Sequence, residues 1–326
     1  MKIGKKPYYR ISILVITLLL LSLASVFLFP TLIDFSMEKT KLLHVLKKIR
    51  LPELMIAITA GAALGLSGAI MQILLDNPLA SPFTLGISSA SAFGASTAII
   101  LGVSHGITWL NTSLFAFIFA SLSTCIVLIV SSCLGISKRT IILIGMSVNF
   151  FFSSANTLLQ YYAPSDAVYR IMFWSTGSLT NATISDSLGL FIVFLVSISI
   201  SMLFSKDMAI IQQGERNAVM HGVNVSLERI LFLLVASLLA SYSVSIVGVI
   251  GFIGLVAPHI SRLLGLESPK LLLLSSGVTG ALLLVIADDI SKSLINPTIL
   301  PISAVTSVLG IPFLLFLLFF RRKKKR

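Results

Sequence analysis

The stretch Gly251-Phe-Ile-Gly-Leu-Val-Ala-Pro-His-Ile-Ser-Arg262 places glycines, a proline and a histidine inside an otherwise apolar segment. Proline removes a backbone hydrogen-bond donor, and glycine weakens a helix. An unsatisfied backbone group in hydrocarbon costs several kcal/mol, so such a segment must pack against protein or line a cavity. The stretch therefore predicts a membrane protein with a structured interior, and not a simple membrane anchor.

The composition of the whole chain is that of a protein embedded in a bilayer. Of the 326 residues, 56% are hydrophobic and 11% are charged, and the mean hydropathy is +1.02. These values lie far outside the range of soluble domains. Apolar runs long enough to cross the hydrocarbon core recur along the entire length, so we expect residues 1–326 to form one transmembrane domain.

Ten apolar segments predict an all-α polytopic membrane protein. Their approximate bounds are 11–30, 53–75, 85–103, 109–133, 140–163, 186–204, 228–247, 250–265, 270–290 and 301–320. The third and eighth segments are rich in glycine and serine and are candidates for broken or re-entrant helices. Ten spans divide into five and five, and an odd number in each half is compatible with an inverted repeat.

The positive charge is distributed as a topology signal. The net charge is +12, but the basic residues form short clusters between the apolar runs and at both ends, which argues for lipid headgroup contacts and against nucleic acid. Placing both termini in the cytoplasm puts most of the 24 basic residues inside. The exception is an outer cluster of Lys39, Lys41, Lys47, Lys48 and Arg50, which is either a solvated interfacial helix or a docking site for an acidic extracellular partner.

Several chemistries are missing from the sequence. The middles of the spans are nearly free of ionisable residues, because Asp76, Asp288, Asp289 and His259 all fall near span ends, and this argues against a proton or sodium pathway. We find no phosphate-binding loop, no catalytic grouping, and no metal or cofactor motif. Cys125 and Cys133 share one apolar run and are expected to be reduced core residues. A pump of this composition would take its energy from another subunit.

The longest inner loop, about residues 205–228, is the candidate contact for such a subunit. It contains Gly214-Glu215-Arg216-Asn217-Ala218-Val219-Met220-His221-Gly222-Val223, in which glycines bracket a polar stretch about two helical turns long. Ala218, Val219 and Val223 would supply apolar contacts. The alternative is a surface loop without a partner.

Three motifs occur in order along the chain, and together they resemble the FecCD family, the permease subunits of ABC importers for iron chelates, haem and cobalamin. The residues that carry the resemblance are Arg50-Leu51-Pro52, Gly61, Ser67-Gly68, Gln72, Asn77 to Pro82 and Leu85-Gly86; then Gly214-Glu215 and His221-Gly222-Val223; then Gly251 to Pro258-His259 and Arg262, with Leu300-Pro301 and Gly310-Ile311-Pro312 near the end.

The resemblance implies ten helices in each of two permease subunits, identical or paralogous, in a bacterial cell membrane above two cytoplasmic ATPase subunits. The permease itself would be no enzyme. The residues implied to couple it to the ATPase are Gly214, Glu215, Arg216, Ala218, His221, Gly222 and Val223. A ferric siderophore is the favoured cargo because that class is the commonest in the family, with haem or cobalamin as alternatives. The rival interpretations are an ion-coupled secondary transporter and a structural or assembly membrane protein.

The resemblance also implies sites outside the coupling loop. An extracellular or periplasmic substrate-binding protein would dock through Arg50 and Lys292, and because Glu53 stands where many members have arginine, Lys47 and Lys48 would supply the missing charge. A structural or gating role is expected for Gln72, Asn77, Pro78, Gly251, Gly254, Pro258 and His259. Asn156 and Gln160 either line the path or hold helices together.

Overall fold

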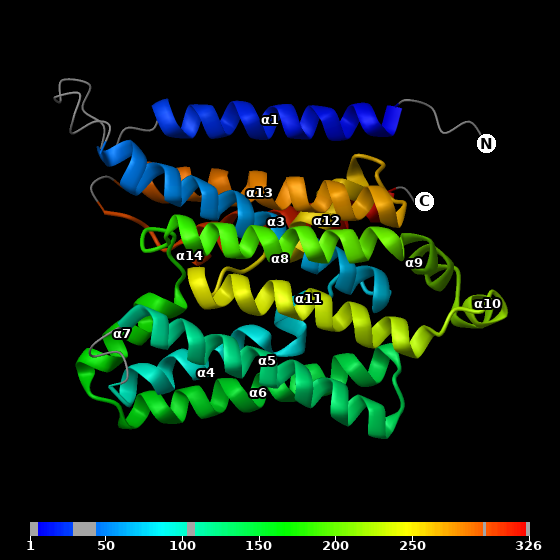
Figure 1. The fold of residues 1–326 in the computed structure, drawn as a ribbon, viewed down its shortest axis with the longest axis horizontal. Helices are drawn as coiled ribbons and strands as arrows, with labels where there is room; N and C mark the ends of the chain where they lie inside the picture. Colours follow the sequence, from blue (N-terminus) through cyan, green and yellow to red (C-terminus); the bar gives the residue numbers. More distant parts are fainter. Residues whose placement is uncertain (1–5, 29–43, 103–107, 296–297, 324–326) are drawn as a thin grey trace.

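The computed structural model describes residues 6–28, 44–102, 108–295 and 298–323, and the described part of the chain is helical and contains no strand (Figure 1). The longer helices lie side by side, with α3, α8 and α11 crossing the middle of the bundle in this view (Figure 1). The elements are α1 (Lys6–Leu28), the π-helical turn η1 (Leu46–Arg50), α3 (Leu51–Leu74), the 3-10 turn η2 (Pro82–Leu85), α4 (Ile87–Ile100), α5 (Thr108–Leu134), α6 (Lys138–Tyr162), α7 (Ser165–Ser175), α8 (Ile184–Leu203), α9 (Ser205–Gln212), α10 (Glu215–Met220), α11 (Val225–Val247), α12 (Ile253–Leu263), α13 (Pro269–Ser293) and α14 (Ile302–Lys323).

Each of the ten predicted apolar segments coincides with a helix. Within the described ranges, seven helical segments are long and apolar enough to cross a membrane, and the shorter apolar helical segments are Ile87–Ile100 (α4) and Ile302–Leu315 (the first part of α14). The two segments predicted to be broken are indeed short, with 14 residues in α4 and 11 in α12. The sequence did not predict α7 or α9, which are amphipathic helices between the apolar runs.

Small residues set the spacing of the central helices. A Cβ atom added to Gly61 of α3 would lie 2.5 Å from the carbonyl oxygen of Gly280 in α13. A Cβ atom added to Gly68, farther along α3, would lie 1.7 Å from the carbonyl oxygen of Gly254 in α12. Such contacts let helix backbones touch directly, which is how membrane helices pack without a hydrophobic driving force between them. In the stretch Gly251–Arg262, Gly254 therefore forms a close contact with α3.

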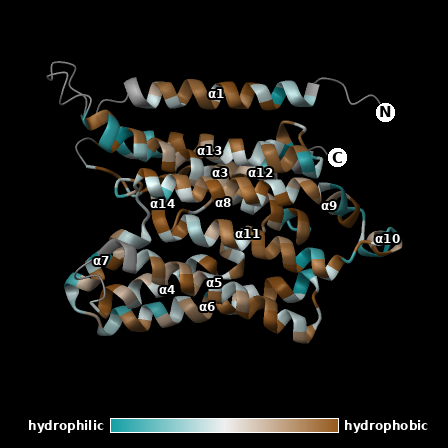
Figure 2. Cartoon of the chain, viewed as in Figure 1, coloured by the Kyte–Doolittle hydropathy of each residue, from teal (hydrophilic) through white to brown (hydrophobic). Residues whose placement is uncertain are grey.

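The outer helices present apolar side chains on the bundle surface. On α6, Leu143, Phe150, Phe151 and Leu158 are all exposed, and apolar colouring extends over the surface helices (Figure 2). A surface of this kind requires lipid or another membrane subunit to cover it. Both cysteines are free, but they lie exposed on α5, so the prediction that they are core residues is wrong. The α5 segment is apolar all round, and no pattern in it marks the buried face.

The bundle has two ends, which we name by their helices. The α10 end carries α9 and α10, and the α7 end carries α7 (Figure 1). The helix α3 runs from Arg50, which precedes it at the α7 end, toward Asp76 at the α10 end, and Lys292 lines the same small pocket as Arg50. Arg10 of α1 donates to the carbonyl oxygen of Leu264, which follows α12. The sequence assigned Arg10, Asp76 and the 205–228 loop to one side of the membrane, and the structure places them at the same end.

Candidate functional site

The α10 segment is a short helix held between two glycines in unusual backbone conformations. Gly214 has a φ of 123° and Gly222 a φ of 78°, backbone angles that residues with a side chain rarely adopt. No atom lies within 4 Å of the position that a Cβ atom would occupy on either residue. These glycines are therefore required by the turns at both ends of α10, not by close packing.

The α10 segment buries one side and exposes the other. Ala218 is fully buried in a small core with Ile211 and Val225, and Val223 packs against that core. The exposed apolar residues are Val219 and Met220, which are 64% and 79% exposed. Arg216 and His221 are also exposed. Of the three predicted apolar contacts, Ala218 and Val223 belong to the small core, and Val219 is exposed. Met220, which was not predicted, is exposed beside it.

Arg229 of α11 joins α10 to a second loop. Its side chain is 1% exposed, and its Nη2 atom donates to Glu215 Oε1 at 2.5 Å. Its Nη1 atom donates to the backbone carbonyl oxygen of Ile136, in the turn between α5 and α6, at 3.1 Å. The hydrogen bond from Arg229 is the main reason why the pKa of Glu215 lies below its ordinary value. Neither partner of Arg229 is close to it in the sequence, so no local pattern pointed to this contact.

The α5–α6 turn is linked in turn to the end of α3. Lys138 Nζ, in the first turn of α6, lies 3.1 Å from Asp76 Oδ2. Asp76 has a φ of 47°, and the chain turns sharply after it. Asn77 Oδ1 accepts a hydrogen bond from the amide of Leu79 at 2.9 Å, across Pro78.

The stretch from Gly251 to Arg262 contacts α3 through polar groups as well as glycines. Gln72 Nε2 donates to the Leu255 carbonyl oxygen at 3.2 Å, and Gln72 Oε1 accepts a hydrogen bond from Arg262. His259 Nδ1 lies 2.8 Å from the same Leu255 oxygen. Phe252, with a φ of 65°, turns the chain from Gly251 into α12, where Pro258 is buried. Among the described residues, no group of three potential metal ligands lies together.

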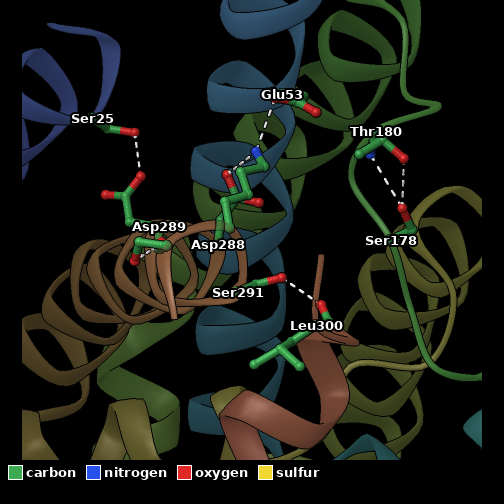
Figure 3. Close-up of polar contacts among 10 residues, drawn as sticks. Ser25, Glu53, Ser178, Thr180, Asp288, Asp289, Ser291 and Leu300 are labelled. Carbon is green, nitrogen blue, oxygen red and sulfur yellow. Dashed lines mark hydrogen bonds and ion pairs between the residues drawn. The ribbon is translucent and has the colours of Figure 1, made fainter. Parts of the chain in front are cut away.

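The α7 end contains a buried ionic cluster. Lys292 Nζ lies 2.9 Å from Glu53 Oε2 and 2.6 Å from Asp288 Oδ2. Ser25 of α1 donates to Asp289 Oδ1 at 2.6 Å, so α1 is tied to the same region (Figure 3). The sequence placed Arg50, Lys292 and the two aspartates on one side of the membrane, and the structure brings them together.

Burial changes the expected docking contacts. Arg50 and Lys292 are 4% and 6% exposed, so in this conformation neither presents its charge to a partner. Lys47 and Lys48, one turn earlier in η1, are exposed. Asp288 lies four residues before Lys292 on α13, but the sequence could not anticipate the contact with Glu53, which comes from α3. Lys39 and Lys41 of the same basic cluster lie outside the described residues.

A cavity of about 450 Å³ opens at the α7 end, between α7, the end of α11 and the segment before α14. Arg170 is the cation in its lining, which includes no carboxylate among the described residues. The other polar side chains in the lining are those of Thr112, Thr176, Ser178, Thr180 and Asn181. Most of the lining is apolar and includes Phe173 and Trp174. Ser178 and Thr180 bond each other at 2.8 Å, and Ser291 donates to the Leu300 carbonyl oxygen beside the cavity (Figure 3). The sequence did not predict this cavity, because no helix was expected at α7, which supplies Arg170 and part of the lining.

Known proteins resemble this chain over nearly its whole length. The sequence model of the FecCD transport family matches residues 11–320. The hemin transport system permease of Yersinia pestis and an Fe(3+)-citrate import system permease of Bacillus subtilis are each 31% identical over 98% of both chains. The vitamin B12 import system permease of Yersinia pseudotuberculosis is 33% identical over 83% of this chain and 80% of its own. A solved structure described as an inward-facing metal-chelate type ABC transporter superposes with a TM-score of 0.88 at 28% identity, covering 95% of this chain and 99% of its own.

Proposed function

The chain belongs to the FecCD transport family as an ABC importer permease, and from this premise we propose that it carries ferric siderophores across the cell membrane. ATP would be hydrolysed by separate cytoplasmic subunits, and the chelate would cross intact without bond chemistry in the permease. ATP binding and hydrolysis would move the α10 segments and switch a central path between outward and inward access.

The observation that carries this proposal is the cavity at the α7 end. Its volume lies in the range of small-molecule sites. The lining is mainly apolar, and its one cation among the described residues, Arg170, suits a ligand that carries negative charge on oxygen atoms. Ferric siderophores and ferric citrate have this chemistry, whereas cobalamin presents mainly amides. The relatives named for haem, citrate and vitamin B12 show how widely the cargo varies within the family.

The proposed partners follow from the exposed residues at each end. Val219, Met220 and Arg216 would contact the ATPase, and Lys47 and Lys48 would attract an acidic substrate-binding protein. The exposed apolar face of α6 would be covered by lipid or by the second permease, identical or paralogous. In this arrangement residues 1–326 act as one transmembrane domain with both termini in the cytoplasm.

The rival interpretation as an ion-coupled transporter would use the buried carboxylates Glu53, Asp288 and Asp289. The contacts of these groups favour a structural role, because Lys292 pairs with the first two and Ser25 donates a hydrogen bond to the third. An ion-coupled transporter would also work without ATPase subunits.

The test is uptake into proteoliposomes that contain the permease, its ATPase subunits and its substrate-binding protein. Radioactive iron would be supplied as ferric citrate, a hydroxamate chelate and a catecholate chelate, with haem and cobalamin as competitors. We expect iron uptake that requires ATP. Cobalamin uptake in place of iron uptake would contradict the cargo assignment, and uptake by the permease alone would contradict the mechanism.

Arg170→Gln tests the cavity within the same assay. Loss of the cation should reduce uptake of the strongly anionic ferric citrate by about tenfold, as expected for one charged hydrogen bond of roughly 1.5 kcal/mol, and should affect a neutral hydroxamate chelate less. Arg139→Gln is the matched control, because Arg139 is an exposed arginine at the opposite end. Equal loss for both chelates would argue against a role of Arg170 in anion binding.

A further inference from the structure

Three connecting segments at the α10 end are joined by a continuous series of polar contacts. Glu215, at the start of α10, bonds Arg229, which also bonds the carbonyl oxygen of Ile136 between α5 and α6. Two residues later, Lys138 pairs with Asp76 at the end of α3. The series therefore runs from α10, through α11 and the α5–α6 turn, to the central helix α3.

Resting on the importer function proposed above, we propose that Arg229 is a positioning residue that couples displacement of α10 to displacement of the α5–α6 turn and of α3. In this role the Glu215 side chain would not bind the ATPase. It would instead fasten α10 to the buried arginine, and the partner would push on the exposed Val219 and Met220.

Burial and the shape of the guanidinium group support this role. Arg229 is 1% exposed, and a buried cation that loses its partners leaves an uncompensated charge. Its side chain must therefore follow its acceptors or keep them in place. The planar guanidinium holds two acceptors in fixed directions, which an ammonium group does not do. Arg229 thus forms a rigid connection between a carboxylate on α10 and a backbone atom of another loop.

Glu215 and Arg229 differ in exposure, as expected if a force applied to α10 from outside is passed to the inside of the bundle. The Glu215 side chain is 51% exposed, so it lies where a partner acts on α10. The guanidinium lies inside the bundle. The turn that accepts its second hydrogen bond is itself well fixed, because Ser137 Oγ accepts from the Thr140 amide at 3.1 Å and thereby caps α6.

The test compares substrate transported per ATP hydrolysed in the assembled transporter, with iron supplied as the chelate that the wild type imports. Arg229→Lys keeps the charge but loses the double hydrogen bond. We expect ATP hydrolysis to continue while uptake per ATP falls about fivefold or more, the lower range of typical coupling effects. A purely structural defect would lower uptake and hydrolysis together. Lys270→Gln is the matched control, because Lys270 is an exposed cation at the same end, in the first turn of α13.

A charge exchange separates the two contacts of Arg229. In the double variant Glu215→Arg and Arg229→Glu, an ion pair between α10 and α11 is possible again, but a carboxylate cannot donate to the Ile136 carbonyl oxygen. We expect uptake per ATP to stay low. Wild-type coupling in this variant, or in Arg229→Lys, would overturn the proposal.

A distance measurement keeps the proposal testable if the variants fail to fold. Spin labels at Gln213, just before α10, and at Arg139, just after the turn, both occupy exposed positions. In an otherwise wild-type transporter we expect their separation to stay the same in the nucleotide-free and ATP-bound states, because the two segments move together. A change in separation would overturn the proposal. A wild type that imports nothing with ATP would instead refute the proposed function.

Discussion

Lys292 is the residue whose loss should cost the most stability at the α7 end. It lies between Glu53 and Asp288, and all three side chains are at most 8% exposed. Lys292→Met leaves two buried carboxylates without their cation, which should destabilise the protein by about 3–5 kcal/mol. The measurement is the thermal unfolding midpoint of the purified protein in detergent.

The control for this prediction removes the stranded charges as well. Adding Glu53→Gln and Asp288→Asn to Lys292→Met should restore most of the lost stability, because paired buried charges can be replaced by neutral groups at little net cost. If the triple variant is as unstable as the single variant, the loss comes from the lysine's packing and not from uncompensated charge.

The stability that the Glu215–Arg229 pair gives to α10 should decrease in acid. The pKa of Glu215 is lowered chiefly by the hydrogen bond from Arg229, so pairing contributes stability above the ordinary glutamate pKa, about 4.3, and the contribution is lost as the pH falls through the lowered value. Hydrogen exchange of the α10 amides, corrected for intrinsic rates, should show constant protection from neutral pH to about pH 5 and weaker protection in stronger acid. The Glu215→Gln variant should lack this transition, and an identical transition in that variant would assign it to another group.

The sequence placed several residues at the correct end of the molecule without revealing their contacts. Glu215 and Lys292 were both singled out, but as contacts for partner proteins. Asp288 lies four residues before Lys292 on α13, a spacing that the sequence does show. The other neighbours, Arg229 of Glu215 and Glu53 of Lys292, come from segments that no local spacing connects. A pattern along the chain identifies which side of the membrane a charge occupies, whereas its pairing depends on how the helices pack.

At the scale of single elements, the contact of α3 with α12 should tolerate no side chain at Gly68. A Cβ atom there would lie 1.7 Å from the Gly254 carbonyl oxygen, and that atom is backbone and cannot rotate away. Gly68→Ala should therefore force the helices apart and destabilise the protein by at least about 1–3 kcal/mol. The thermal unfolding midpoint in detergent measures this.

Gly277 of α13 provides the matched control. A Cβ atom there would lie 3.5 Å from the Phe194 ring, an ordinary contact distance. Alanine also favours a helix over glycine by about 1 kcal/mol, so Gly277→Ala should leave stability unchanged or slightly higher. Equal loss in both variants would show that the close contact between α3 and α12 is not what limits substitution.

The helices themselves were largely predictable, because about twenty apolar residues in a row leave few alternatives in a bilayer. The amphipathic helices α7 and α9 were missed because hydropathy detects spans and not short interfacial helices. The glycines of α3 and α12 indicated a close contact, but their partners could not be assigned from the sequence, since Gly61 meets Gly280 across more than two hundred residues of chain.

At the scale of the whole molecule, the polar contacts gather at the two ends of the bundle. The Arg229 series lies at the α10 end, and the Lys292 cluster lies at the α7 end. Between these clusters the described helices carry no charge to move, so a change at one end reaches the other through shifts of packed helices. The helix α3 extends from Glu53 to the turn at Asp76 and connects both clusters.

The orientation of the bundle in the membrane gives the last prediction. The basic residues favour a cytoplasmic α10 end. Single cysteines would replace Asn181 at the α7 end and Arg139 at the α10 end, both exposed, in a background where Cys125 and Cys133 are changed to alanine. A membrane-impermeant maleimide should label Asn181→Cys in intact cells, and should label Arg139→Cys after the membrane is opened. Labelling of Arg139→Cys in intact cells would place α10 outside, where no cytoplasmic ATPase could reach Val219 and Met220.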